Sequence, residues 1–358
     1  MSDTNRQIDI FGTESRAAIE AALPAYLPAR RWFGGKARTI RSVEIEEAIP
    51  FSGDPPRYYL TLIRVSYVEG DPQTYVIPLT FAAGERAEEV RRETPQAVLV
   101  EVSGGAEGII YDTSWDREFT LALLEAIAAG RRFGGDTGEV VAWPMPMEGS
   151  GSVNTEGLMD LEPSVVKSEQ SNTSVIYGDR YILKLFRRLE AGTSPELEVG
   201  RFLAEKRFAS TPPLDGAIEY HRQRGEPITM AVLQGFVPNK GDAWRYTLSR
   251  LADYFQSNWE AAGGEDLLPR SGHLLATLEE EVPTPVRKAA GSYLEQAALL
   301  GRRTAEMHIT LASDPSDPAF APQPFDDDYR RSTYEAMRDL TVDAFELLGD
   351  NIDKLQEA

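Results

Sequence analysis

The chain has 358 residues, of which 37 are basic and 57 acidic, so its formal net charge is −20. This length predicts two or three domains with buried cores, and a hydrophobic share of 42% excludes a wholly disordered protein. Because both halves of the sequence are acidic, the charge argues against nucleic acid as a partner.

The rare residue types exclude further classes of protein. There is no cysteine, which excludes disulfides, thiolate nucleophiles and cysteine-based zinc sites. The three histidines lie far apart in the sequence and form no local metal motif. Met1–Gly12 lacks the basic flank and apolar run of a secretory signal, and no window approaches roughly 18 continuous apolar residues. We therefore expect a cytoplasmic protein that neither enters a membrane nor binds one.

Residues 1–130 predict a first domain that combines helices with a sheet. Ser15–Leu27 has the apolar spacing of a short helix. From Ile40 to about Ile110 the apolar residues recur mostly at every second position, between turn-forming pairs of glycine and aspartate, which predicts antiparallel hairpins. Trp115–Ala129 is again helical in pattern. This first domain is therefore α+β.

Residues 131–240 predict a second, β-rich domain after a polar connector at 146–163. The predicted strands are Ser164–Lys167, Thr173–Tyr177, Tyr181–Phe186, Ile218–His221 and Ile228–Leu233. Between the third and fourth of these strands, Ser194 and Pro195 predict a helix start, with an N-cap serine and a proline in the first turn.

Residues 241–358 have helical periodicity throughout. The predicted helices are Tyr246–Ala262, Leu274–Glu281, Tyr293–Leu311 and Ser332–Leu348. The chain order is therefore an α+β domain, a second sheet with one helix, and an all-helical region.

The loop between the first two strands of the second domain carries the main chemical hint. Its small polar residues, 168–174, offer backbone N–H groups and hydroxyls, which are the groups that a triphosphate needs. Lys184 on the third strand can reach those phosphates if a carboxylate holds it, and the following helix offers Glu196 and Glu198. We expect Glu198, because it lies beside the apolar position Phe202. This order of loop, lysine and helix glutamate is typical of the protein-kinase-like small lobe.

The literal residues of these segments resemble the bacterial maltokinases, which are ATP-dependent sugar kinases related to aminoglycoside phosphotransferases. The motifs that carry the resemblance follow the order of that family over nearly the whole chain. They are Leu27-Pro-Ala-Arg-Arg-Trp-Phe-Gly-Gly-Lys36, Glu169-Gln-Ser-Asn-Thr-Ser174, Tyr181-Ile-Leu-Lys-Leu-Phe-Arg-Arg188, Pro195-Glu-Leu-Glu-Val-Gly-Arg-Phe-Leu203, Leu233-Gln-Gly-Phe-Val-Pro-Asn-Lys-Gly-Asp-Ala-Trp244, Leu300-Gly-Arg-Arg-Thr-Ala-Glu-Met-His308 and Tyr329-Arg-Arg-Ser-Thr-Tyr-Glu-Ala-Met-Arg338.

The resemblance implies a fold, a set of ligands and a site. The implied fold is an aminoglycoside-phosphotransferase-like small lobe, preceded by an α+β cap with an antiparallel sheet and followed by part of an all-helical large lobe. The implied ligands are ATP, Mg²⁺ and maltose or a related sugar, and trehalose synthase is an implied partner. The implied site residues are Ser171, Asn172, Thr173 and Ser174 at the ATP phosphates, Lys184 at the α- and β-phosphates, Glu198 holding Lys184, and Gln234, Phe236 and Val237 around the adenine.

Several of these motifs also have a plain structural interpretation. A serine-rich loop is a common turn, and a Lys-Leu-Phe strand usually presents a solvated lysine. In the first motif we favour Trp32 and Phe33 as core anchors, with Gly34-Gly35 as a turn, over a docking patch or an anion site. We interpret His308 as a hydrogen-bonded packing residue, and the acids Asp326–Asp328 as a solvated helix cap.

The catalytic signatures of the family are absent from the sequence. No histidine begins a His-x-Asp motif and no Asp-Phe-Glu occurs, so no residue is predicted as catalytic or as a metal ligand. We expect the chain to hold the cap, the ATP lobe and the beginning of the large lobe. Three hypotheses stay open: an N-terminal portion that is inactive alone, a non-catalytic ATP-binding or docking module, and a kinase for another sugar or amino sugar.

Overall fold

The computed structural model describes residues 10–53, 57–103, 107–145, 157–166, 171–258, 281–282 and 284–352. They fall into two compact units, residues 1–303 and residues 304–358, each of which is considered by itself. Within the described ranges, no helix has both the length and the apolar character that crossing a bilayer requires.

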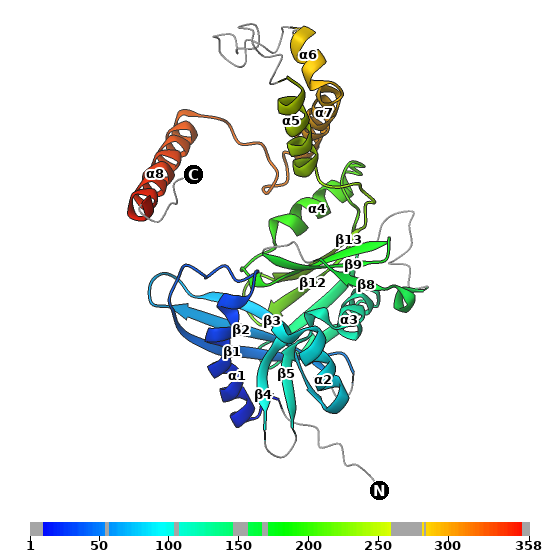
Figure 1. The fold of residues 1–358 in the computed structure, drawn as a ribbon, viewed down its shortest axis with the longest axis vertical. Helices are drawn as coiled ribbons and strands as arrows, with labels where there is room; N and C mark the ends of the chain where they lie inside the picture. Colours follow the sequence, from blue (N-terminus) through cyan, green and yellow to red (C-terminus); the bar gives the residue numbers. More distant parts are fainter. Residues whose placement is uncertain are drawn as a thin grey trace. The chain divides into compact units, whose positions relative to one another are not determined.

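The first sheet is antiparallel, with the strand order β1-β2-β3-β5-β4 (Figure 1). Strand β11 also pairs with β3. Its strands are β1 (Ile40–Phe51), β2 (Tyr58–Tyr67), β3 (Gln73–Ala83), β4 (Val98–Val102), β5 (Gly108–Asp112) and β11 (Arg188–Leu189). In β1, Val43 and Ile45 are buried while Glu44 and Glu46 are exposed, as alternating side chains require. The hairpin sheet predicted between residues 40 and 110 is confirmed.

Helices and short 3₁₀ turns surround this sheet. They are α1 (Thr13–Tyr26), η1 (Leu27–Ala29), α2 (Gly84–Glu93), η2 (Pro95–Ala97) and η3 (Thr113–Trp115). Ile19 and Leu23 of α1 share one buried cluster with Trp32 and Phe33, which are 7% and 2% exposed. The interpretation of Trp32 and Phe33 as core anchors is confirmed. The sequence analysis did not predict α2.

The second sheet is also antiparallel, with the order β6-β7-β12-β13-β10-β9-β8. Its strands are β6 (Arg132–Gly134), β7 (Gly138–Pro144), β8 (Pro163–Val165), β9 (Asn172–Tyr177), β10 (Tyr181–Phe186), β12 (Leu214–Arg222) and β13 (Ile228–Gly235), and its helices are α3 (Arg117–Ala128), η4 (Leu158–Asp160) and α4 (Pro195–Glu205). Leu183 of β10 packs in one cluster with residues of α3, whereas Val232 of β13 packs with Leu197 of α4. The two helices therefore cover opposite faces of this sheet.

The two sheets share one hydrophobic core. Leu60 and Leu62 of β2 belong to the same buried cluster as Val175 of β9 and Leu183 of β10. Strand β11 follows the second sheet in sequence but pairs with Thr74 and Tyr75 of the first. The predicted α+β class with antiparallel sheets is confirmed, whereas the division at residues 130 and 240 stays a prediction.

The C-terminal helices are α5 (Ala243–Asn258), α6 (Thr284–Ala290), α7 (Tyr293–Leu311) and α8 (Asp327–Asn351). The predicted helix Leu274–Glu281 lies outside the described residues apart from Glu281. Asp326 caps α8 by accepting a hydrogen bond from the Tyr329 amide at 2.8 Å, which confirms the solvated cap. His308 is exposed, so the prediction that it is a packing residue is wrong. The described residues of α7 are all exposed or half-buried, so this helix offers no buried position for a packing residue.

Candidate functional site

The face of the second sheet that carries Lys184 is set by the register of three strands. Lys184 of β10 lies opposite Ser174 of β9 and opposite Val232 of β13. Because directly opposed residues point to the same face of an antiparallel pair, these three side chains share the face that α4 covers. Ser174 and Val232 are fully buried, whereas the side chain of Lys184 is 29% exposed. The side chain of Lys184 is therefore partly open to solvent, at the edge of the area that α4 covers.

Two residues toward the start of β10, the same face carries a small apolar shelf. Ile182 lies opposite Ile176 of β9 and opposite Gln234 of β13, and all three side chains are half-buried. The shelf is therefore next to Lys184 and partly open to solvent. The sequence analysis named Gln234 but missed Ile176 and Ile182, although the period of two counted back from Lys184 places Ile182 on its face.

Lys184 is held by the helix that follows β10, but not by the predicted carboxylate. Its Nζ lies 2.6 Å from Oε1 of Glu196, and both side chains are about 30% exposed, at 29% and 30%. Glu198 is exposed. The pairing predicted for Glu198 is therefore corrected to Glu196.

Helix geometry explains this correction. Glu196, Gly200 and Leu203 are spaced i, i+4 and i+7, which places them on one face of α4. Leu203 is buried, and a Cβ on Gly200 would lie 3.8 Å from Leu214 of β12, so this face points at the sheet. Glu198 lies one hundred degrees or more away from each of these three around the helix, by the roughly 3.6 residues of a turn.

The start of α4 is fixed by hydrogen bonds that the sequence predicted in part. The Ser194 hydroxyl accepts a hydrogen bond from the Leu197 amide at 3.2 Å, which confirms the N-cap, and Pro195 takes the first helical position. The Ser194 amide donates to the Thr229 hydroxyl of β13 at 2.9 Å. Because the N-cap residue Ser194 is hydrogen-bonded to β13, Glu196 in the first turn of α4 lies close to Lys184.

The four residues predicted at the phosphates point in different directions. Ser171 is exposed just before β9. Asn172 and Ser174 share the face of Lys184, because Asn172 lies opposite Phe186 as Ser174 lies opposite Lys184. Thr173 points to the other face, where its hydroxyl accepts a hydrogen bond from Arg187 Nε at 2.8 Å. The preceding loop residues 167–170 lie outside the described residues, and the phosphate role of all four residues stays a prediction.

Arg187 links this site to the first sheet, and the sequence analysis missed it. Its side chain is fully buried, and its Nη2 lies 3.1 Å from Oδ2 of Asp112, which is also fully buried at the end of β5. The guanidinium also donates to Ser114 and lies 4.9 Å from the ring centroid of Trp32. Trp32 of the first maltokinase-like motif and Arg187, which directly follows β10, therefore meet beside one buried ion pair. In sequence, Arg187 was indistinguishable from the half-exposed Arg188 beside it.

The residues predicted around the adenine lie at the end of β13 and directly after it. The Phe236 amide donates to the Arg180 carbonyl at 2.9 Å, while Val237 is exposed and its carbonyl accepts a hydrogen bond from Asn239 Nδ2 at 3.1 Å. A Cβ on Gly235 would lie 3.0 Å from Pro213, which explains why glycine suits this position. Burial raises the pKa of nearby Asp215 to about 6. The adenine roles of Gln234, Phe236 and Val237 stay predictions.

The described residues offer no ligand set for a metal ion. In these ranges, no group of three or more histidine or acidic side chains is arranged to hold one. The Mg²⁺ that the resemblance implies therefore does not fit the described residues, and we derive no step through it.

Comparison with known proteins finds a family model that matches part of the chain. Residues 26–116 match the family model of the maltokinase N-terminal cap domain. Similar solved structures include a glucosamine kinase in complex with glucosamine, ADP and inorganic phosphate (15% identity, TM-score 0.44, 83% of this chain and 52% of that chain). Crystal form A of a glucosamine kinase is also similar (16% identity, TM-score 0.43, with the same two coverages).

The chain spans about half the length of these solved structures. The cap-domain match includes Trp32, which packs against Arg187, and Asp112, which pairs with it. The predicted resemblance to the maltokinases is thus confirmed by the similarity of residues 26–116 to the maltokinase N-terminal cap domain.

Proposed function

We propose that the chain is part of an ATP-dependent sugar kinase of the maltokinase type, in which it supplies the cap and the nucleotide-binding sheet. The observation that carries the proposal is the ion pair between Lys184 on a central strand and Glu196 on the adjoining helix. Protein kinases use this pairing of a strand lysine with a helix glutamate to position the ATP phosphates. The match of residues 26–116 to a maltokinase cap supports the same function.

The roles follow from what each side chain can do. Lys184 contacts the α- and β-phosphates as a point charge, and Glu196 keeps it from turning toward bulk solvent. Ile176 and Ile182 give the adenine ring an apolar surface, and the backbone after Gln234 pairs with its edge. Maltose is the proposed acceptor, and its phosphorylation would yield maltose 1-phosphate.

The sequence holds neither a His-x-Asp nor an Asp-Phe-Glu motif, so we propose that the isolated chain binds nucleotide weakly and does not transfer phosphate. Production of ADP that depends on maltose, by the purified chain, would contradict this part of the proposal and leave the nucleotide site standing.

The experiment that tests the nucleotide site compares two glutamates of one helix. Affinity for a fluorescent ATP analogue is measured for the wild type, Lys184→Ala, Glu196→Gln and Glu198→Gln. We expect Lys184→Ala and Glu196→Gln to lose about tenfold or more in affinity, because the first removes the charge at the phosphates and the second removes the carboxylate that holds Lys184 in place. Glu198→Gln is the matched control and keeps the wild-type affinity. Equal effects of the two glutamate variants would overturn the assignment of Glu196.

A further inference from the structure

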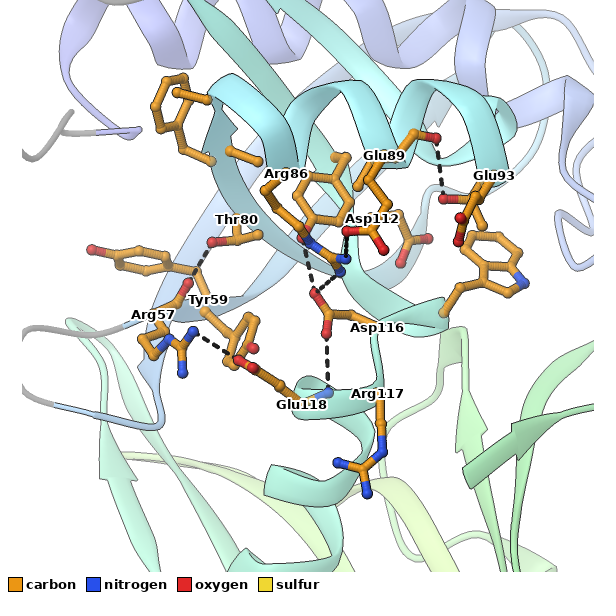
Figure 2. A pocket seen from close by; sticks show the side chains of 18 of the residues that line it. Arg57, Tyr59, Thr80, Arg86, Glu89, Glu93, Asp112, Asp116, Arg117 and Glu118 are labelled. Atoms are coloured by element: carbon orange, nitrogen blue, oxygen red, sulfur yellow. Dashed lines mark hydrogen bonds and ion pairs between the residues drawn. The ribbon is translucent and has the colours of Figure 1, made fainter. Parts of the chain in front are cut away.

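A second candidate site lies in the cap, away from Lys184. It is a cleft of about 1100 Å³ between strands β2 and β3, helix α2 and the start of α3 (Figure 2). Of the described residues that line it, none belongs to the Lys184 face. The volume is at the upper end for small-molecule sites, which run to roughly 1,000 Å³, so the cleft has room for a ligand of several rings.

One polar group in the cleft, the Asp116 carboxylate, is held in place by three hydrogen bonds. Asp116, only 8% exposed, accepts hydrogen bonds from the Tyr111 hydroxyl and from Arg86 Nη2, both at 2.9 Å. Its other oxygen accepts the Glu118 amide at 3.0 Å and caps α3. Burial, together with the charge of Asp116, raises the pKa of Tyr111, so its hydroxyl keeps its proton. Figure 2 shows Arg86 reaching down from α2 to Asp116.

The charges around the cleft nearly cancel, because its six carboxylates pair with five arginines, of which Arg86 pairs with both Glu89 and Asp116. Six carboxylates line it, and each has an arginine nitrogen within 3.1 Å. The pairs are Glu89–Arg86 (2.6 Å), Asp116–Arg86 (2.9 Å), Glu118–Arg57 (2.7 Å), Glu162–Arg117 (3.1 Å), Glu93–Arg92 (3.0 Å) and Asp112–Arg187 (3.1 Å). A phosphate would need unpaired cations, and a basic peptide would need unpaired acids. The cleft therefore favours an uncharged ligand.

Aromatic rings complete the lining. Tyr59, Phe81 and Trp115 are half-buried around the cleft, so part of each side chain is open to a ligand. Aromatic side chains offer apolar faces, and tyrosine and tryptophan also carry a hydrogen-bonding group. Paired guanidinium and carboxylate groups supply planar donors and acceptors beside them. Apolar faces flanked by such planar groups match a sugar ring, which has C–H faces and hydroxyl edges.

We propose that the cap cleft binds a neutral oligosaccharide, at a site separate from the nucleotide site. The choice of an α-glucan as the oligosaccharide rests on the proposed function, in which the sugar is maltose. The inference that the cleft binds a sugar of some kind depends only on its lining residues. The site would hold a longer glucan than the acceptor itself.

The test titrates maltoheptaose into the full chain by calorimetry, with a variant and a matched control. Arg57→Ala/Glu118→Ala removes an ion pair at the cleft whose side chains are 64% and 59% exposed, so the fold should persist. Arg132→Ala/Glu139→Ala removes an exposed pair outside the cleft. Thermal unfolding checks that both fold.

We expect wild type and control to bind maltoheptaose alike, and Arg57→Ala/Glu118→Ala to bind about tenfold more weakly, because two polar contacts are lost. Absence of binding to the wild type, equal weakening in the control, or binding of oligolysine in place of the glucan would overturn the proposal. Because ATP-analogue affinity is measured separately, loss of the nucleotide site with retained glucan binding would overturn only the proposed function.

Discussion

The sheet region, up to Gly235, and the helices α5 to α8 differ in what covers their apolar side chains. In the sheet region the clusters are closed: Leu60, Leu183 and Leu233 are each at most 1% exposed. Among the described residues, none after Leu233 is buried, and Ile309 and Leu340 are 71% and 70% exposed. Both regions have regular amphipathic patterns. Periodicity thus predicts an element, but it does not show what the element packs against.

This difference in burial predicts that the two regions contribute unequally to the free energy of unfolding. The sheets bury their apolar faces against one another and against α3 and α4, so their elements stabilise each other. Most helical stability in proteins comes from packing an amphipathic face, and no described residue of α5 to α8 is fully buried. We therefore expect mutations in the sheet region to change the free energy of unfolding and mutations in α8 to change it little.

The largest expected effect is at the buried ion pair of the sheet region. Arg187→Met leaves Asp112 buried without its charged partner, which should lower the free energy of unfolding by about 3–5 kcal/mol. Urea denaturation followed by circular dichroism measures it. Arg188→Met is the control, because Arg188 is half-exposed and pairs at the surface with Glu190. If both variants lowered the free energy of unfolding by a similar amount, the buried pair of Arg187 and Asp112 would have no special role in stabilising the two sheets.

A matched pair of leucines compares the regions directly. Leu183→Ala in β10 removes a fully buried side chain and should cost about 2–5 kcal/mol. Leu340→Ala in α8 removes a side chain that is 70% exposed and should change the free energy of unfolding by less than about 0.5 kcal/mol. The same denaturation experiment reads both. A cost of several kcal/mol for Leu340→Ala would mean that α8 is packed in solution, and the contrast between the regions would fail.

A smaller, pH-dependent effect is expected at Glu47 in β1. Burial opposes the charge of Glu47, but hydrogen bonds from the side chains of Thr137 and Tyr220 and from the backbone of Thr137 and Gly138 outweigh it and lower the pKa below the ordinary 4.5. A depressed pKa stabilises the folded state above the unfolded pKa, and this stabilisation is lost as the pH falls through the folded pKa.

Glu47→Gln should therefore lower the free energy of unfolding by about 1–3 kcal/mol at pH 7, and the difference from wild type should shrink below about pH 4. Unfolding curves at pH 7 and pH 3.5 measure this. The exposed neighbour Glu44→Gln should be close to wild type at both values. A difference that does not depend on pH would contradict the charge-based account.

Local signals in the sequence were sufficient for much of the fold. The predicted strands Thr173–Tyr177 and Tyr181–Phe186 correspond to β9 and β10, and Ser194 with Pro195 predicted the start of α4. Strand β7 was missed because it pairs with β12, which is distant in sequence, and β6 was missed because it is only three residues long and pairs with β7. Strand β11 was missed because it is only two residues long.

The candidate site was predictable in outline but not in its pairings. Lys184 was found from its strand, whereas the choice between Glu196 and Glu198 needed the angle at which α4 meets the sheet. Thr173 was predicted at the phosphates, but strand alternation turns it toward Arg187. Arg187 itself was missed, since burial of an arginine depends on a carboxylate, Asp112, that lies 75 positions earlier in the chain.

The central claim is that Lys184 stands beside the phosphates of bound ATP. An acyl phosphate of ATP tests this directly, because a lysine amine close to the phosphates attacks the acyl carbon, forms an amide and releases ATP. Digestion and mass spectrometry then identify the labelled lysine. We predict labelling of Lys184, suppressed by excess ATP, with Lys206 at the end of α4 unlabelled. Labelling that spreads over both lysines and does not respond to ATP would contradict the claim.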